Sequence, residues 1–239
     1  VGRDKDQASE ITTTEYSSEA DLNARDNAKK ISENSKSNIL YDEKYGNIRE
    51  YQLTVTEYDL GSPSDSSYFY VTLEYNPGDD QAHTMTTKEY SAAGWNSNNI
   101  TKIETKDKIT YNPSGNMDTY RLKVEVPNAA GDTTDDETSW FFVEIAYYKG
   151  KVSDMTVTEY ENSPQVVGKK ASGTMLRRET KTDITYDGKN IESYNLNVEE
   201  FKGTSPNSGA KRSYFKVTLT YDPGENQAST MTTEEYWSE

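Results

Sequence analysis

The residues that could perform acid–base or metal chemistry are few and isolated. His83 is the only histidine, and the chain has no cysteine. Without further histidines or a thiol, neither a hydrolase triad nor a cysteine-based zinc site can be assembled. The positions that match His83 in the recurring pattern described below carry Ser153 and Ser229. We therefore interpret His83 as a solvent-exposed turn residue rather than a general base or a metal ligand.

Carboxylates are abundant but form no recognisable ligand pattern. The run Asp132-Thr-Thr-Asp135-Asp136-Glu137 offers oxygen ligands for Ca²⁺, but it lacks the spacing of a known calcium loop and occurs once, which favours a solvated acidic loop. A carboxylate pair could hydrolyse a glycosidic bond, yet with 41 Asp and Glu such pairs arise everywhere. No phosphate loop, HExxH motif or dinucleotide fingerprint is present. We expect a chain that is not an enzyme and has no cofactor or metal.

Aromatic side chains are the remaining candidates for a binding surface. They make up 11% of the chain, and 19 of them are tyrosines. A flat platform for sugars could be formed by six of them: Tyr68, Tyr70, Trp140, Phe142, Tyr214 and Trp237. The alternative is packing between neighbouring strands on a sheet whose second face is also covered. We favour this structural interpretation.

The charge of the chain limits its partners. The 41 Asp and Glu outnumber 26 Lys and Arg and give a net charge of −15. Such a chain repels the phosphates of nucleic acids and anionic membrane surfaces. No run of about 18 apolar residues exists, so we expect no membrane insertion.

A short motif organises the sequence. It occurs four times, 70 to 76 residues apart, at Ile11–Tyr16, Met85–Tyr90, Met155–Tyr160 and Met231–Tyr236. The last three copies each close a block of similar sequence, which we place at residues 39–92, 93–162 and 163–239. A repeat of this kind is a strong indicator of a tandem architecture.

Each block contains four segments in which apolar residues alternate with polar ones, the pattern of half-buried strands. The first segment of each block ends at Ile39–Tyr41, Ile109–Tyr111 or Ile184–Tyr186, and the fourth is the motif itself. The second and third segments are Tyr51–Val55 and Tyr68–Tyr75, Tyr120–Val126 and Trp140–Tyr147, and Tyr194–Val198 and Tyr214–Tyr221. Short turns such as Asn76-Pro77-Gly78 favour antiparallel neighbours. The prediction is an all-β protein of three tandem homologous four-stranded antiparallel meander repeats.

The first copy of the motif has no block before it. Residues 1–18 are therefore an N-terminal orphan strand, and residues 19–38 form a linker or short helix. The orphan strand could add to an edge of its own first block, remain from a longer array, or insert into a neighbouring subunit as donor strands do. We favour insertion, which makes Ile11, Thr12, Thr13, Thr14, Glu15 and Tyr16 the inter-subunit strand.

These features predict a non-catalytic structural subunit of an extracellular or cell-surface filament or stalk that associates with itself into a homopolymer. The main alternative is a secreted binding module that recognises a glycan or a protein. It would use aromatic faces or the variable connections 59–67, 127–139 and 201–213. A carboxylate-based hydrolase is a third, weaker alternative.

Overall fold

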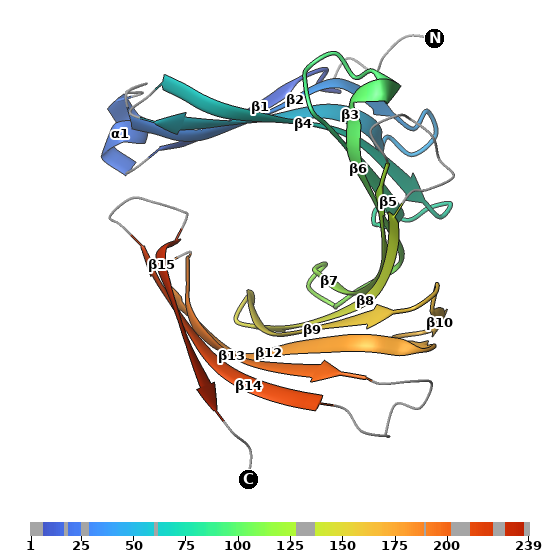
Figure 1. Ribbon diagram of the computed structural model, residues 1–239. Coiled ribbons are helices and arrows are strands. Elements are labelled where there is room, and N and C mark those ends of the chain that lie inside the picture. The colour runs from blue at the N-terminus through green and yellow to red at the C-terminus, as the bar shows by residue number, and fades with distance from the viewer. Residues whose placement is uncertain are drawn as a thin grey trace. The chain divides into compact units, whose positions relative to one another are not determined.

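The computed structural model shows a chain built almost entirely from strands, which confirms the all-β prediction (Figure 1). The structure describes residues 7–16, 19–24, 29–59, 62–127, 137–188, 190–201, 211–221 and 228–236. Within these residues, no helix has the length and apolar character that crossing a membrane requires.

Thirteen strands form one antiparallel sheet in which spatial order follows chain order. The first five are β1 (Ile11–Tyr16), β2 (Lys30–Tyr41), β3 (Ile48–Asp59), β4 (Ser62–Tyr75) and β5 (Ala82–Tyr90). The next four are β6 (Ile100–Tyr111), β7 (Met117–Val126), β8 (Glu137–Tyr148) and β9 (Lys151–Tyr160). The last four are β12 (Met175–Asp187), β13 (Asn190–Glu200), β14 (Lys211–Tyr221) and β15 (Ala228–Tyr236). Each strand therefore pairs with its neighbours in sequence, as expected where connections are short.

In the described part of the chain, a helix, a 3₁₀ turn and a short hairpin lie outside this sheet. Helix α1 (Glu19–Ala24) follows β1, and the 3₁₀ turn η2 (Ser97–Asn99) precedes β6. A separate hairpin, β10 (Gln165–Val167) with β11 (Lys170–Ser172), lies between β9 and β12 in sequence. The segment expected as a linker or short helix, residues 19–38, thus contains α1 and, from Lys30 onward, strand β2.

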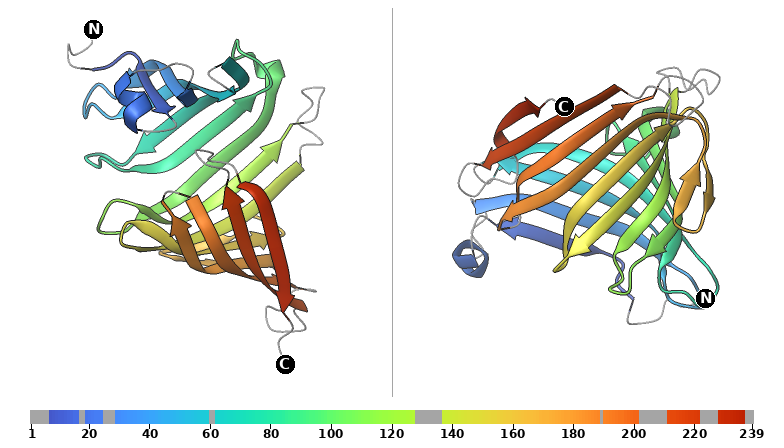
Figure 2. Two further views of the ribbon diagram at one scale, coloured as in Figure 1. Left: turned by 90° about the vertical axis from the view of Figure 1, so that its left-hand side faces the viewer. Right: turned by 90° about the horizontal axis from the view of Figure 1, so that it is seen from below.

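The chain divides into two compact units, and each has its own buried residues. The first comprises residues 1–105 and 125–137, and the second comprises residues 106–124 and 138–239. Buried apolar side chains of the first unit are Ile39, Val71, Ala82 and Tyr90. Those of the second are Ile109, Phe142, Val143, Tyr160, Val198 and Val217. In the second unit, strands β12 to β15 run side by side (Figure 2).

Three hairpins of the sheet share one register. The recurring motif lies in the second strand of β4–β5, β8–β9 and β14–β15. Its final tyrosine faces an aromatic residue in every case: Tyr68 with Tyr90, Trp140 with Tyr160, and Tyr214 with Tyr236. Its methionine also faces an aliphatic residue each time: Leu73 with Met85, Ile145 with Met155, and Leu219 with Met231. The motif therefore specifies a cross-strand ladder as well as a strand.

A second recurring feature is a left-handed backbone residue in β2, β6 and β12. Asn38, Lys108 and Asp183 have φ of 51°, 52° and 53°, and each stands directly before an isoleucine. The pairing of β2 with β3 and of β12 with β13 shifts register next to these residues. A bulge admits one extra residue and so returns the following isoleucine to the covered face. Ile39 is 1% exposed as a result.

Replacing Lys108 with glycine is expected to raise the free energy of unfolding by up to about 1 kcal/mol, because a left-handed conformation strains any residue with a Cβ atom. Lys108 is exposed, so the substitution removes little packing. The matched control is Lys106→Gly two residues earlier, where the ammonium lies 5.3 Å from the centre of the Tyr120 ring. Lys106→Gly should lower the free energy of unfolding, as measured by urea denaturation. Equal losses in both variants would contradict the assignment of strain to Lys108.

Candidate functional site

His83 lies in β5 rather than in a turn, and it is half-buried. Its Nδ1 is 2.9 Å from Oγ1 of Thr84. Among the described residues, no cluster of three or more histidines and carboxylates could hold a metal ion. Residues 132–136 of the acidic run lie outside the described part of the chain. The contact of His83 is therefore local, to the hydroxyl of the next residue.

One hollow of the second unit, of about 330 Å³, brings carboxylates together. Asp118, Glu144 and Asp154 line it, with Lys169 at its side. Asp118 forms an ion pair with Lys169 and accepts a hydrogen bond from Thr110. Burial acts to raise the pKa of Asp118, but these partners outweigh it and hold the pKa below its ordinary value. Because a general acid needs a raised pKa, Asp118 is poorly suited to that role in a glycosidase pair.

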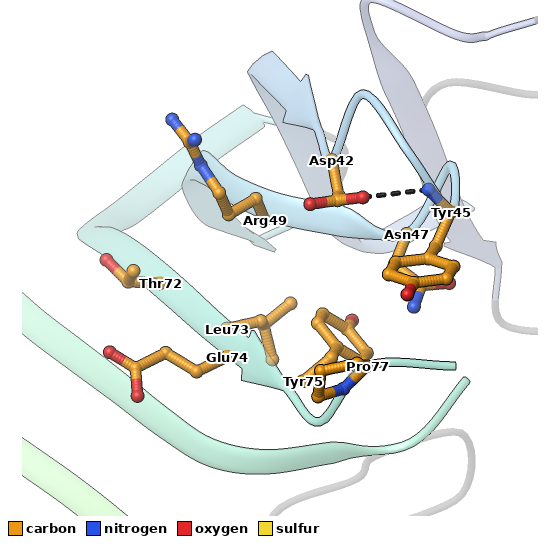
Figure 3. Close-up of a pocket in the computed structure, with 9 residues that line it drawn as sticks. All are labelled: Asp42, Tyr45, Asn47, Arg49, Thr72, Leu73, Glu74, Tyr75 and Pro77. Carbon is orange, nitrogen blue, oxygen red and sulfur yellow. Dashed lines mark hydrogen bonds between the residues drawn. The ribbon is translucent and has the colours of Figure 1, made fainter. Parts of the chain in front are cut away.

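A hollow of about 400 Å³ in the first unit lies beside the turn between β2 and β3 (Figure 3). Oδ1 of Asp42 accepts the backbone N–H groups of Lys44 and Tyr45 at 2.9 and 2.8 Å. This carboxylate therefore closes its own turn. Figure 3 shows the Arg49 guanidinium and the Glu74 carboxylate pointing in different directions. The polar groups of this hollow do not converge on one point, and we assign it a structural role.

The aromatic pair of the first hairpin is covered by a residue from the following segment. Trp95 packs edge-on against Tyr68 and Tyr90, with ring centres 6.1 and 5.5 Å apart. Tyr90 is 8% exposed. Trp95 has φ of 54° and follows Gly94, so a tight turn directs the indole onto the two tyrosines.

The aromatic pair of the second hairpin, Trp140 and Tyr160, is covered in a similar way. Pro164 is fully buried, and Arg121 donates hydrogen bonds to Ser163 Oγ at 2.8 Å and to Pro164 O at 3.2 Å. The Arg121 guanidinium also lies over the Trp140 ring at 5.4 Å. Tyr160 is 5% exposed. A Cβ atom at Gly173 would lie 3.1 Å from Cδ1 of Tyr160, so the segment after β9 packs against Tyr160 as the segment after β5 packs against Tyr90.

The aromatic pair of the third hairpin, Tyr214 and Tyr236, is not covered by a described segment. Tyr236 is 51% exposed, and a hollow of about 600 Å³ lies against it. Its lining consists of Thr180, Thr182, Asn195, Leu196, Asn197, Tyr214, Phe215, Lys216 and Tyr236. Oδ1 of Asn197 is inaccessible to solvent and has no hydrogen-bond partner in the structure. Such an unsatisfied acceptor is uncommon in proteins and calls for an explanation.

The predicted sugar platform is not a continuous aromatic surface. Phe142 is 2% exposed, Tyr68 lies under Trp95, and Trp140 lies under Arg121. Desolvation and a hydrogen bond with Glu50 raise the pKa of Tyr70 to about 12. Trp237 lies outside the described residues. Sequence reasoning identified the strand aromatics but missed Trp95 and Pro164, whose signal was a bulky apolar residue in a linker rich in Gly, Asn and Ser.

The proposed inter-subunit strand, residues 11–16, is β1, and it pairs with β2 of its own chain. Ile11 faces Lys36 and Tyr16 faces Lys30, with a bulge before Tyr16. β9 pairs with β12 in the corresponding register, from Met155 with Lys181 to Tyr160 with Met175, with a bulge near the same tyrosine. β1 thus occupies on β2 the place that β9 occupies on β12.

A tyrosine hydroxyl fixes both of these junctions. Tyr41 donates to the carbonyl of Ala8 at 2.9 Å, and Tyr186 donates to the carbonyl of Val152 at 2.9 Å. Ala8 and Val152 each lie three residues before the first residue of the motif. The two tyrosines therefore hold β1 on β2 and β9 on β12 in the same register.

Comparisons with known proteins assign no function to the hollows or to the β1–β2 junction. No protein-family model matches the chain, and no curated protein or solved structure matches it. The function is therefore inferred from the strands and side chains described above.

Proposed function

We propose that the chain is a non-catalytic structural subunit of an extracellular or cell-surface filament or stalk. Its building units are the three tandem four-stranded meanders of residues 39–92, 93–162 and 163–239. The subunits associate into a homopolymer by strand addition, with Ile11–Tyr16 as the inter-subunit strand. The observation that carries the proposal is the register of β1 on β2, which reproduces the internal β9–β12 junction.

This register supports the proposed strand exchange between copies. The same pairing forms whether β1 comes from its own chain or from a neighbour, since the partner residues are identical in every copy. Ile11, Thr12 and Thr13 are exposed in β1, so the strand has little burial to lose when it leaves. Residues 17–29 connect it to β2 and set its reach. If each copy gives β1 to the next, the exchange continues as an open filament.

The location is part of the proposal. Polymers built by strand donation are known among surface fibres. The chain has no cysteine, so assembly does not depend on disulfides. The shared register of the hairpins β4–β5, β8–β9 and β14–β15 supports the view that the subunit is itself a short array of similar units.

Cross-linking between singly substituted chains tests the exchange. Thr12 faces Ser35 across β1 and β2, so a mixture of Thr12→Cys chains and Ser35→Cys chains is expected to form disulfides between copies. Directly facing residues are close enough for this bond. Filaments should appear by negative-stain microscopy and should be lost when residues 1–18 are deleted.

The matched control uses the equivalent internal pair, Thr156 with Thr180. A mixture of Thr156→Cys chains and Thr180→Cys chains should give no disulfide between these positions in different copies. A double Thr12→Cys/Ser35→Cys chain that closes wholly within itself, together with no cross-linking in the mixture, would refute strand exchange.

A secreted binding module is the second candidate, and the open hollow beside Tyr236 is the observation that favours it. Of the three connections considered as binding loops, the first is mostly strand, because β3 ends at Asp59 and β4 begins at Ser62. Residues 128–136 and 202–210 of the other two lie outside the described part of the chain. Specific binding of a glycan or protein by a stable monomer would support this candidate over the filament.

A further inference from the structure

One face of the first unit carries a row of four side chains that crosses strands β2 to β5. In this row Lys36 faces Leu53, Leu53 faces Phe69, and Phe69 faces Glu89. Residues that face each other directly on neighbouring strands point to the same side of a sheet, so the four side chains share one face. The row therefore has a cation at one end, an anion at the other, and two apolar side chains between them.

The contacts of the two end residues leave a net charge at each end. The ammonium of Lys36 lies 4.9 Å from the centre of the Tyr51 ring, a contact that keeps the positive charge. At the other end, Lys102 of β6 lies between Glu89 and Glu104, at 3.3 and 3.2 Å. One cation thus serves two carboxylates, and the β5 end of the row remains negative.

The second unit repeats this row. Its members lie on the four strands β12 to β15 and are Lys181, Leu196, Phe215 and Glu235. The lysine again lies over a tyrosine, with 5.0 Å between the ammonium of Lys181 and the centre of the Tyr194 ring. In both units the cation lies on the first of the four strands and the anion lies on the motif strand. The composition, order and direction of the row are therefore repeated together.

The apolar part of the row in the first unit is not fully covered. Leu53 and Phe69 are half-buried, whereas Val71, a smaller side chain beside them on the same face, is 2% exposed. Among the described residues of this unit, no strand or helix forms a second layer over the row. An apolar sheet face is buried by packing a second layer on it. The face across β2 to β5 therefore lacks such a layer.

The order of the charges indicates which surface would cover this face. A two-fold axis parallel to the strands, between β3 and β4, places β2 of one copy over β5 of the other. Lys36 then lies over Glu89 of the second copy at both ends, and Leu53 lies over Phe69 in the middle. Such an isologous contact requires a patch that is complementary to itself. An apolar centre with a charged rim is also the usual anatomy of a protein interface.

We propose that two copies of the chain associate through the β2–β5 face of their first units, sheet against sheet. Lys36 of each copy pairs with Glu89 of the other, and the apolar residues of the two rows pack together. Sheets that pack in this aligned way lie about 10 Å apart. Strands β2 to β5 form the face whether β1 comes from the same chain or from a neighbour. The proposal is therefore independent of strand exchange and adds a lateral contact to it.

Charge reversal in the full-length protein tests this pairing. Sedimentation velocity between about 1 and 200 µM should show association of the unmodified chain. Lys36→Glu or Glu89→Lys alone should weaken it by about tenfold or more, because each places two pairs of like charges in contact. A mixture of Lys36→Glu chains with Glu89→Lys chains should associate about as tightly as the unmodified protein, since both pairs are again of opposite charge. Chains that had only lost their fold would not be rescued by mixing.

Two controls accompany this experiment. Lys44→Glu and Glu43→Lys make the same charge changes at exposed turn residues of the first unit and should leave the association unchanged. The disulfide between Thr12→Cys chains and Ser35→Cys chains reports strand exchange separately, and it should form equally well when both chains also carry Glu89→Lys. Failure of the face pairing is therefore distinguishable from failure of strand exchange.

Either of two results would overturn the proposal. The first is that Lys36→Glu and Glu89→Lys leave the association unchanged, or that the unmodified chain stays monomeric over the whole concentration range. The second is that Lys36→Glu chains are rescued by Glu235→Lys chains and not by Glu89→Lys chains. The face would then pair with the row of the second unit, and the two-fold contact between first units would be wrong.

Discussion

Replacing Phe142 with alanine is expected to lower the free energy of unfolding by about 3–5 kcal/mol, the usual cost of removing a buried phenylalanine ring. Phe142 and its neighbour Val143 are each 2% exposed. Successive residues of a strand point to opposite faces, so both faces of β8 are covered at this point. The residue facing Phe142 on β9 is Thr158, which is also 2% exposed. Little rearrangement can fill the cavity that alanine leaves there.

Urea unfolding followed by circular dichroism measures this effect. Phe142→Leu keeps most of the apolar volume and should cost less than about 1.5 kcal/mol. Tyr148→Ala, on the same strand but 66% exposed, should change stability by less than about 0.5 kcal/mol. A loss below about 1 kcal/mol for Phe142→Ala would mean that this face of β8 is not a packed core.

The strands were predictable because the buried face repeats every second residue. In β4, Phe69, Val71, Leu73 and Tyr75 alternate with Tyr70, Thr72 and Glu74, and Val71 is 2% exposed as this pattern requires. Turn residues such as Gly78, with φ of 90°, mark the ends of the strands. Local periodicity and turn chemistry therefore sufficed for the fold class.

The start of β2 was not predictable in this way. Residues 30–37 read Lys-Ile-Ser-Glu-Asn-Ser-Lys-Ser, with one apolar residue and no alternation. They become a strand because β1 and β3 pair with them on both sides. Ser32 is 9% exposed although it is polar. Here the backbone ladder of the neighbours, rather than a hydrophobic pattern, specifies the strand, and single-strand patterns cannot show this.

The candidate binding site was predictable only in part. The alignment of the motif placed Tyr90, Tyr160 and Tyr236 at equivalent positions, which indicates a shared environment. Their exposures of 8%, 5% and 51% differ because segments later in the chain cover the first two. Such cover depends on contacts like those of Trp95 and Arg121, which carry no periodic signal in the sequence. The difference between the three hairpins therefore needed the structure.

Arg121 is the residue on which the cover of the second hairpin depends most. Its Nε donates to Asp107 at 2.7 Å, and a second nitrogen donates to the other oxygen of the same carboxylate. Its remaining hydrogen bonds hold Ser163 and Pro164. The planar guanidinium thus links β6, β7 and the covering segment, and it makes a cation–π contact with Trp140.

Arg121→Ala is therefore expected to lower the free energy of unfolding by about 2–4 kcal/mol, because it leaves the half-buried Asp107 without its charged partner and frees the segment over Tyr160. Tryptophan fluorescence should shift to longer wavelength as Trp140 becomes more exposed to solvent. Arg121→Lys keeps the positive charge but cannot bind both oxygens of Asp107 at once. We therefore expect it to lower the free energy of unfolding by roughly half as much as Arg121→Ala.

Arg212→Ala provides the matched control, since Arg212 is an exposed arginine whose Nε lies 2.9 Å from Glu199 Oε1. Exposed ion pairs of this kind contribute less than about 1 kcal/mol. Equal losses for the two arginine variants would show that the Arg121 network is no stronger than a surface pair. The segment after β9 would then be held in place by the burial of Pro164 and by the ion pair of Lys169 with Asp118.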